Sequence, residues 1–508
     1  MALLEKSVNL SIMHVEQKSA AEVVATARDA FNKGFTKNVK HRMKHLKSFK
    51  KFLDENEESI VQAMHEDLRK QREEARFEIS IAVNHLKYLM ANLKEWVEPK
   101  RPPKRWLELL DGVYVYHDPL GVVLVMGAWN VPLLTLVPVT GAMAAGNCVV
   151  IKPSHNCPAF GNMLAKVLPT YLDSLCYPVF LGDIDQTKIL LEQRFDYIYY
   201  TGSTSVGKIV HLAANKYLTP TTLELGGKNP VYIDPSADLE LTATRVMWGK
   251  CFNSGQACIA PDYVLCTKSV EKEFVLHARN ALKKFYGDDP RCCPIVNDQH
   301  FKRLQSLMTG LNIVIGGRTD PLENYIEPTV ATGVSPNDPI MQEEIFGPIL
   351  PIVTVTCFKE AVKFINRREK PLALYIFTKN SSVKNYIIEH TSSGGVTVND
   401  TLMHLMVESL PFGGVGLSGM GCYKGKSSFF TFVHKKSVLV KNFNGIIEKI
   451  NRLRYPPYSS QKTDVMGFLL KYRRGPSWIW LFYVGIFLIG FVVGFLVFNY
   501  FALMNDMK

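Results

Sequence analysis

The chain contains 508 residues, with a formal net charge of +12, 47% apolar residues and 21% charged residues. This composition excludes a disordered tail, a collagen-like repeat and a disulfide-held miniprotein. At about 150 residues per domain, the length predicts two or three domains with enough interior to bury a site. The ten cysteines include no CxxC pair, which argues against a zinc ribbon or a disulfide framework and indicates a reducing compartment without a structural metal.

The first third of the chain is predicted to be helical. Residues 1–18 lack an apolar core of signal-peptide length, so we expect no entry into the secretory pathway from this end. Ser19 and Glu22 have the spacing of a capping box for a helix that ends near Gly34. A charged, periodic stretch over residues 39–94 predicts further helices.

After Pro102 and Pro103 the pattern changes to short strand-like runs separated by segments of helix length. The predicted strands are residues 121–127, 148–153, 177–182 and 197–202, followed after Gly227 by 229–233, 262–266, 348–353 and 372–377. This alternation is typical of an α/β fold with parallel sheets.

The C-terminal end predicts a membrane anchor. Residues 478–498 carry no charge and lie within an uncharged stretch over 475–505. A helix of this length spans the hydrocarbon layer of roughly 30 Å, whereas a buried core helix, the alternative, is rarely apolar on every face. Lys471, Arg473 and Arg474 precede the span, so the positive-inside tendency places the rest of the chain in the cytosol.

Much of the positive charge lies just before this span. Residues 435–474 contain ten basic residues against Glu448 and Asp464. Such a segment is attracted to anionic lipid by about 1 kcal/mol per residue near the surface, although a solvated linker is the alternative. Membrane lipid therefore accounts for the charge, and we expect no nucleic-acid partner. Residues 465–474 predict a short interfacial helix.

Two glycine patterns are candidates for nucleotide-binding turns. Gly202 and Gly207 lie in TGSTSVG, between a predicted strand and a helix, where a backbone can approach a pyrophosphate. A plain strand-to-helix turn is the alternative. Gly414, Gly416 and Gly419 spell GxGxxG, but no strand precedes them, so they predict a loop.

Three side chains could carry chemistry, and each also has an ordinary structural explanation. Cys258 follows a Gly-Gln turn whose dipoles could favour a nucleophilic thiolate, although most cysteines are buried apolar residues. Glu224 ends a strand before two glycines and could act as a general base. The Asn130 amide could stabilise an oxyanion by about 3 kcal/mol.

The motifs GAWN, IKPS, TGSTSVG, LELGGK, GQAC, EEIFGP and PFGG occur in that order. This series resembles the aldehyde dehydrogenase superfamily over roughly residues 19–434. The short front end, the run TLELGGKNP, and LRYPP followed by an apolar span are similar to its membrane-anchored fatty aldehyde dehydrogenase branch, of the class 3 type.

The resemblance implies an α/β architecture: a Rossmann-type parallel-sheet cofactor domain, an α/β catalytic domain, a small bridging sheet and a C-terminal transmembrane helix. The implied segments are 19–225 (mainly NAD(P)-binding, with a bridging part near 103–120), 226–410 (catalytic), 411–440 (bridging and dimerisation), 441–474 (basic juxtamembrane) and 475–504 (anchor).

The resemblance also assigns roles to residues. It implies Cys258 as nucleophile, Glu224 as general base and Asn130 as the oxyanion amide. The implied cofactor-binding residues are Lys152, Gly202, Ser203, Gly207, Glu344 and Phe346, with no metal ligand. NAD is the expected cofactor, while NADP stays open because His155 stands where relatives often carry Glu. Val131 stands where relatives tend to carry an aromatic residue.

The implied reaction is oxidation of medium- to long-chain aliphatic aldehydes to carboxylic acids. Such substrates partition into a bilayer by about 0.8 kcal/mol per CH₂, which gives a reason for the anchor. The expected partners are a lipophilic aldehyde, membrane lipid and a second copy of the chain. The expected membrane is the endoplasmic reticulum, with the peroxisome or the mitochondrial outer membrane as alternatives. A tethered scaffold without turnover and a CoA-acylating dehydrogenase are the competing functions.

Overall fold

The computed structural model describes residues 19–105, 108, 111–288, 292–443, 445–471 and 478–506, and in the last segment it describes side chains only for residues 482–497. The chain divides into two compact units. Unit 1 comprises the described parts of Met1–Trp96 and Pro119–Val433, and unit 2 those of Val97–Asp118 and His434–Lys508. Every residue predicted for catalysis or cofactor binding lies in unit 1.

A five-stranded sheet forms the first half of unit 1. Its strand order is β15 (Gly419–Met420), β5 (Thr221–Glu224), β4 (Tyr197–Thr201), β2 (Val122–Met126) and β3 (Cys148–Lys152). Neighbouring strands are parallel except for β15, which is antiparallel to β5. Because Thr201 pairs with Glu224 and Met126 with Lys152, the carboxyl ends of these strands meet at one edge.

One predicted strand is reduced to a single bridge. Within residues 177–182 only Val179 pairs, with Ile151 of β3. Pro178 has no backbone N–H to donate, so a regular ladder cannot extend through this segment.

A seven-stranded sheet forms the second half of unit 1. Its order is β14 (Gly395–Val398), β13 (Ala373–Phe377), β6 (Pro230–Ile233), β7 (Tyr263–Cys266), β12 (Ile349–Thr354), β11 (Thr329–Thr332) and β8 (Asn312–Ile315). All neighbouring pairs are parallel except β11 and β8. A separate two-stranded ribbon pairs β9 (Thr319–Asp320) with β10 (Tyr325–Ile326). The two sheets confirm the predicted α/β class with parallel strands.

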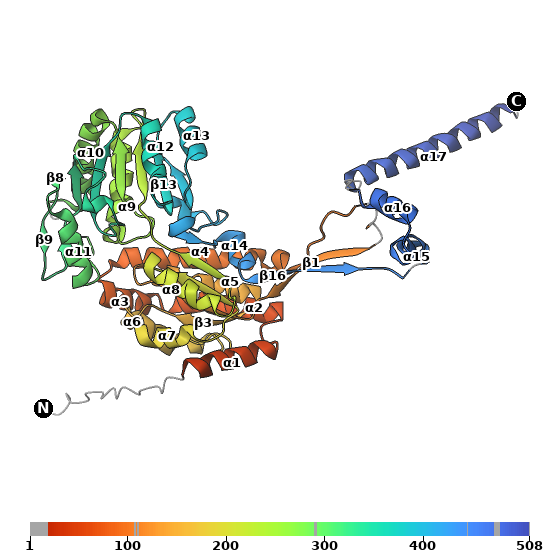
Figure 1. Cartoon of the computed structure of the whole chain (residues 1–508), viewed down its shortest axis with the longest axis horizontal. Helices are drawn as coiled ribbons and strands as arrows, with labels where there is room; N and C mark the ends of the chain where they lie inside the picture. Colours follow the sequence, from red (N-terminus) through yellow and green to blue (C-terminus); the bar gives the residue numbers. More distant parts are fainter. Residues whose placement is uncertain are drawn as a thin grey trace. The chain divides into compact units, whose positions relative to one another are not determined.

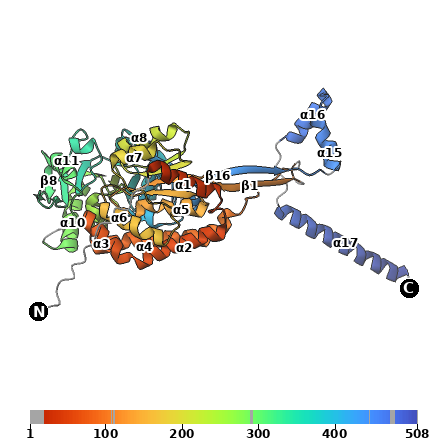
Figure 2. The ribbon, with the colours of Figure 1, turned by 90° about the horizontal axis from the view of Figure 1, so that it is seen from below.

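The N-terminal helices come before the first sheet in the chain, and some of them pack onto its helices. They are α1 (Ala20–Asn32), α2 (Val39–Glu55), α3 (Glu57–Leu68) and α4 (Arg72–Val97). The capping box is confirmed, since Ser19 N–H donates to Glu22 at 2.8 Å and Glu22 N–H donates to Ser19 Oγ at 3.3 Å. Helix α2 packs against α5 (Pro138–Ala145) and α3 against α6 (Pro158–Val167), and Figure 2 shows α2, α3 and α4 on the same side of unit 1. The remaining helices of this half are α7 (Ile184–Leu191), α8 (Thr204–Asn215) and α14 (Gly425–Phe430).

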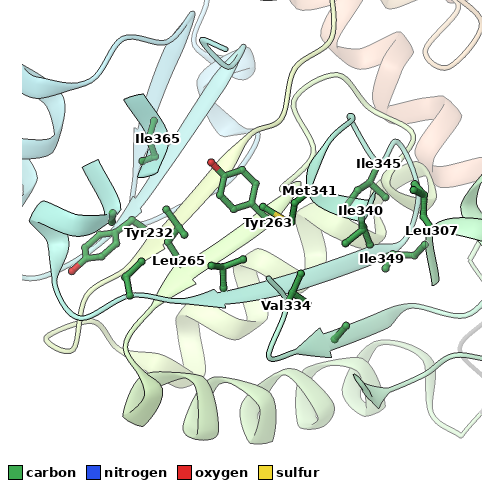
Figure 3. Packing of buried hydrophobic residues seen from close by; sticks show 14 of the residues in the cluster. Tyr232, Tyr263, Leu265, Leu307, Val334, Ile340, Met341, Ile345, Ile349 and Ile365 are labelled. Atoms are coloured by element: carbon green, nitrogen blue, oxygen red, sulfur yellow. The ribbon is translucent and has the colours of Figure 1, made fainter. Parts of the chain in front are cut away.

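Helices cover both faces of the second sheet. Helices α9 (Leu239–Cys251) and α10 (Lys268–Tyr286) lie on one side, and α12 (Phe358–Asn366) and α13 (Ser381–His390) on the other (Figure 1). Apolar residues of α11 (Asp298–Met308), α12 and α13 form one buried cluster with alternate strand residues such as Tyr232 and Leu265. Figure 3 shows Ile340 and Ile345 in the same cluster, so the chain just before Phe346 is anchored on the core.

The described part of unit 2 contains a two-stranded sheet followed by α-helices. Strand β1 (Gly112–Pro119) pairs with β16 (Val433–Val440), and the helices are α15 (Gly445–Asn451), α16 (Ser460–Leu470) and α17 (Trp478–Asp506). Helix α16 begins before the predicted interfacial helix, of which residues 472–474 lie outside the described chain, as do residues 475–477 of the predicted anchor. Among the residues that the structure describes, no helix has both the length and the apolar character needed to cross a membrane. The anchor therefore stays a prediction.

Candidate active site

A single pocket brings together the three residues predicted to carry chemistry. Cys258, Glu224 and Asn130 all line this pocket, although they come from three separate segments of unit 1. The other lining residues are mostly large and apolar, and include Phe77, Leu134, Trp248, Phe252, Leu405 and Met406. The arrangement combines a thiol, a carboxylate and an amide with an apolar wall.

Cys258 follows a turn of unusual backbone geometry. Asn253, Ser254 and Gly255 have φ values of 49°, 53° and 70°, so three successive residues lie in the left-handed region. The Cys258 carbonyl accepts a hydrogen bond from Asn229 Nδ2 at 2.8 Å. Burial raises the pKa of the thiol to about 12, with further increases from the carboxylates of Glu344 and Glu224. The thiol is therefore protonated at neutral pH in this state and requires a base.

Glu224 is a buried carboxyl group without a partner. It is 3% exposed, and neither of its oxygens receives a hydrogen bond from the described residues. Burial raises its pKa well above the ordinary value, and the nearby Tyr199 hydroxyl opposes this shift. Buried polar groups are nearly always satisfied, so an unsatisfied carboxyl in a pocket marks a functional position.

The side-chain amide of Asn130 is fixed by the chain that leads to Cys258. Its Nδ2 donates to the main-chain carbonyl of Gln256 at 3.0 Å. An amide nitrogen carries two N–H groups, so a second donor stays available to a ligand in the pocket. Val131, which departs from the resembled pattern, also lines this pocket.

The strand ends beside the pocket have features that suit a dinucleotide. Ser203 caps α8 by accepting a hydrogen bond from Val206 N at 3.4 Å, and Gly202 precedes it without a side chain. A Cβ atom on Gly207 would lie 2.6 Å from Leu225 Cδ2, so a larger residue here would require the Leu225 side chain to move. The helix N-terminus is thus uncovered at the carboxyl edge of the sheet, where pyrophosphates bind in such folds.

Lys152 ends β3 at the same edge. Its buried ammonium donates to the carbonyls of Pro153 and Gly182, each at 3.2 Å, and burial lowers its pKa to about 8. Since an ammonium has three donors, it can give a third hydrogen bond to a ribose hydroxyl. His155 lies on the surface nearby. The pKa of its imidazole is lowered, first by partial desolvation and then by the positive charge of Lys152.

Glu344 and Phe346 lie on the segment before β12. Glu344 Oε1 accepts a hydrogen bond from Gly227 N at 3.1 Å, and burial together with Asp262 raises its pKa to about 8. Phe346 has a φ of 52°. Its ring packs edge-on against the Trp129 ring, with 5.6 Å between the ring centroids. Asp262 accepts a hydrogen bond from Ile345 N at 2.9 Å and so holds this backbone in place.

These observations test the fit of a dinucleotide and support it. The uncovered helix N-terminus suits a pyrophosphate, and Lys152 and Glu344 present a donor and an acceptor that suit ribose hydroxyls. The described residues contain no group of His, Cys, Asp and Glu able to hold a metal ion. All ten cysteines are free thiols.

The structure also brings residues to the site that were not predicted. Lys70 and Asn253 both donate to the main-chain carbonyl of Asn130, at 3.1 and 2.9 Å. Asn253 lies in the same NSGQAC segment as Cys258, which was a usable signal. No sequence signal pointed to Lys70, because its hydrogen bond to Asn130 joins residues far apart in the sequence.

The fold and pocket define an α/β enzyme with a nucleotide-binding sheet edge and a cysteine in its pocket, and comparisons with known proteins agree. The profile of the "Aldehyde dehydrogenase family" matches residues 4–438. Rat aldehyde dehydrogenase family 3 member B1 is 49% identical, over 86% of this chain and 95% of its own length. Aldehyde dehydrogenase family 3 member A2 of Pongo abelii is 48% identical, over 89% of this chain and 94% of its own length. The mouse "Aldehyde dehydrogenase, dimeric NADP-preferring" is 46% identical, over 86% of this chain and 97% of its own length.

Solved structures give the same result. The substrate-bound Staphylococcus aureus AldH superposes with a TM-score of 0.85 at 38% identity, covering 89% of this chain and all of that one. A betaine aldehyde dehydrogenase from the same organism, in complex with NAD⁺, has a TM-score of 0.76 at 25% identity, covering 84% and 90%. The chain belongs to the aldehyde dehydrogenase family, and its cofactor is NAD(P)⁺.

Proposed function

We propose that this protein oxidises medium- to long-chain aliphatic aldehydes to carboxylic acids through a covalent intermediate on Cys258. The observation that carries the proposal is that Cys258, Glu224 and Asn130 share one pocket with an otherwise mostly apolar lining. An apolar wall stabilises an alkyl chain by about 0.8 kcal/mol per buried CH₂, whereas a small polar aldehyde gains little from it.

In the first step, Cys258 adds to the aldehyde carbon. The thiol proton passes to solvent as the sulfur becomes the nucleophile. The oxyanion that forms on the aldehyde oxygen accepts hydrogen bonds from the free N–H of the Asn130 amide and from the Cys258 backbone N–H. Both donors belong to segments that the fold already holds in place, so little reorganisation accompanies the step.

The second step leaves a thioester on Cys258. Lys152, Gly202, Ser203, Gly207, Glu344 and Phe346 would hold NAD(P)⁺, which would supply the hydride acceptor for this step when bound. Glu224 takes a proton from the water that attacks the thioester, and the carboxylic acid leaves. A buried base with a raised pKa holds that proton more tightly than an exposed carboxylate would.

Steady-state rates across unbranched aldehydes from three to sixteen carbons, each with NAD⁺ and NADP⁺, test the proposal. We expect kcat/KM to rise with chain length by up to about fourfold per CH₂ until the pocket is filled. Acid must form without CoA, because a base placed to activate water makes an acceptor thiol unnecessary. Equal kcat/KM for short and long aldehydes would refute the fatty specificity, and absence of turnover would favour a scaffold.

We further propose that residues 475–504 anchor the enzyme in a membrane, with the body in the cytosol. The support is the uncharged stretch in the sequence and the basic residues that precede it. The endoplasmic reticulum is the membrane we propose, with the peroxisome and mitochondrial outer membrane as alternatives. Deleting residues 461–508 should release the protein from membranes and lower turnover of long aldehydes in vesicles, while short aldehydes are oxidised normally. An equal loss for both substrates would oppose the tethering.

A homodimer is proposed as the working form. Apolar side chains on and just after α8 face solvent: Ile209 is 57% exposed, Leu212 73% and Leu218 86%. Single exposed apolar residues are ordinary, but a group of them is typical of an interface, so we propose this surface as a dimer contact in addition to the predicted dimerisation segment 411–440. The mouse relative is named as a dimeric enzyme, which supports a second copy as the occupant. Leu212→Glu should then halve the mass measured by light scattering, and an unchanged mass would oppose this interface.

A further inference from the structure

A fully buried ion pair lies behind the candidate site. Lys70, between α3 and α4, forms an ion pair with Glu78 of α4, and both side chains are 0% exposed. Burying two charges is costly unless they are paired and their remaining donors are satisfied. Lys70 uses one remaining donor on the main-chain carbonyl of Asn130, at 3.1 Å.

The same carbonyl receives a second hydrogen bond. Asn253 Nδ2 donates to it at 2.9 Å and also to the carbonyl of Gln256 at 3.0 Å. The Gln256 carbonyl in turn accepts from Asn130 Nδ2 at 3.0 Å. These hydrogen bonds form a ring that links Asn130 to the segment that ends at Cys258. We use the term oxyanion clamp for Lys70, Glu78, Asn253 and the main-chain carbonyl of Asn130.

Helix α4 also supports the turn before the nucleophile. Glu74 accepts a hydrogen bond from the backbone N–H of Asn253 at 3.3 Å, and the Ser254 hydroxyl donates to the carbonyl of Cys293. Left-handed backbone at two non-glycine residues in succession persists only where such contacts over-determine it. The N-terminal helices therefore hold both the amide donor and the nucleophile's turn.

We infer that Lys70 is a positioning residue for the oxyanion amide. Its ammonium fixes the Asn130 peptide, so that the second N–H of the side chain stays directed at the oxygen of a substrate bound to Cys258. The inference rests on the proposed function and adds a residue that touches neither substrate nor cofactor. An apolar side chain of similar length fills the same volume but supplies no donor, which separates the positioning role from packing.

The test uses the full chain with Lys70→Met, the double variant Lys70→Met/Glu78→Gln, and Lys47→Met as an exposed-lysine control. Lys70→Met should lower kcat for aldehyde oxidation about 10- to 100-fold, with KM for NAD⁺ changed less than twofold. The double variant leaves no unpaired buried charge, so it should regain the wild-type Tm without regaining kcat. Recovery of kcat together with Tm would overturn the inference.

Two reactions that need no dinucleotide separate this inference from the proposed function. Acylation of Cys258 by 4-nitrophenyl acetate forms an oxyanion, whereas alkylation by iodoacetamide does not. Lys70→Met should slow acylation at least tenfold and leave alkylation within twofold of wild type. Equal slowing of both reactions, or of neither, contradicts the clamp. Acylation by a wild-type enzyme that oxidises no aldehyde would refute the proposed function alone.

A second variant covers the case in which Lys70→Met does not fold. Asn253→Gly tolerates the left-handed backbone and removes the amide donors to Asn130 and Gln256 without adding a charge. It should slow acylation and spare alkylation, as expected for Lys70→Met. If it alters neither reaction, the carbonyl of Asn130 does not need to be held and the inference fails.

Discussion

The carboxylate of Glu344 occupies the space that a Cβ atom on Gly226 would fill. The two glycines of LELGGK therefore do more than end a strand, because they leave room for an acidic side chain that arrives from a different part of the chain. Gly227 contributes a backbone N–H to the same carboxylate at 3.1 Å. The position of the proposed ribose acceptor thus depends on the absence of one methyl group.

Gly226→Ala should displace the Glu344 carboxylate and weaken dinucleotide binding. Loss of one charge-assisted hydrogen bond corresponds to about a tenfold increase in Kd for NADH, measured by fluorescence titration. Gly467→Ala on α16 is the matched control, because a Cβ there meets nothing within 4 Å. A Kd for Gly226→Ala equal to that of the control would argue against the role assigned to Glu344.

The reactivity of Cys258 should rise steadily with pH. Its pKa is raised to about 12, so the thiolate fraction grows about tenfold per pH unit between pH 7 and 10. Iodoacetamide labelling followed by peptide mass spectrometry measures the rate at Cys258 itself. A plateau below pH 9 in the enzyme without cofactor would contradict the burial that raises this pKa.

Glu224→Gln should have opposite effects on labelling and turnover. Removing a negative charge lowers the pKa of the Cys258 thiol, so alkylation at alkaline pH should become faster by severalfold. Turnover should fall by about 100-fold, because the water-activating base is lost. If alkylation and turnover decline together, Glu224 acts on the thiol alone.

His155 should set the preference between the two dinucleotides. His155→Glu places a carboxylate where the adenosine ribose is expected, which favours the 2′-hydroxyl of NAD⁺ and repels the 2′-phosphate of NADP⁺. We expect KM for NADP⁺ to rise at least about tenfold, with KM for NAD⁺ equal or lower. His155→Gln controls for loss of the ring. Unchanged KM values for both dinucleotides would place His155 outside the cofactor site.

Phe77 offers a test of chain-length preference. It lines the pocket and is 37% exposed, whereas Phe285 on α10 is 38% exposed and lies outside the pocket lining. Phe77→Glu should lower kcat/KM for decanal about tenfold, because about 1.5 kcal/mol of apolar contact is lost, and leave propanal nearly unaffected. Phe285→Glu should change neither substrate. A loss shared equally by both aldehydes in Phe77→Glu would indicate a folding defect.

Features that depend on residues close together in the sequence could be predicted, whereas features that depend on distant residues could not. The strands at Cys148–Lys152 and Tyr197–Thr201 were predictable because their residues are apolar, β-rich and bounded by glycine or proline. The capping box depends on two residues three apart. Segment 177–182 had a similar apolar pattern, but Pro178 limits it to one bridge.

The pocket could be predicted only in part. Cys258, Glu224 and Asn130 stand in distinctive local motifs, and the structure places them around one space. The hydrogen bond of Lys70 to Asn130 and the packing of Phe346 on Trp129 join segments with no local signal in common. Such contacts depend on how helices and sheets dock, which a single sequence does not reveal.

The short strand β15 has a consequence for biosynthesis. Gly419 pairs with Glu224, so the edge of the first sheet beside the proposed base is completed by residues that leave the ribosome long after the rest of that sheet. A nascent chain that already contains Cys258 therefore still lacks part of its catalytic surroundings. Any message truncated before codon 419 would yield a product with an open sheet edge, prone to aggregation and unfit to carry out its chemistry.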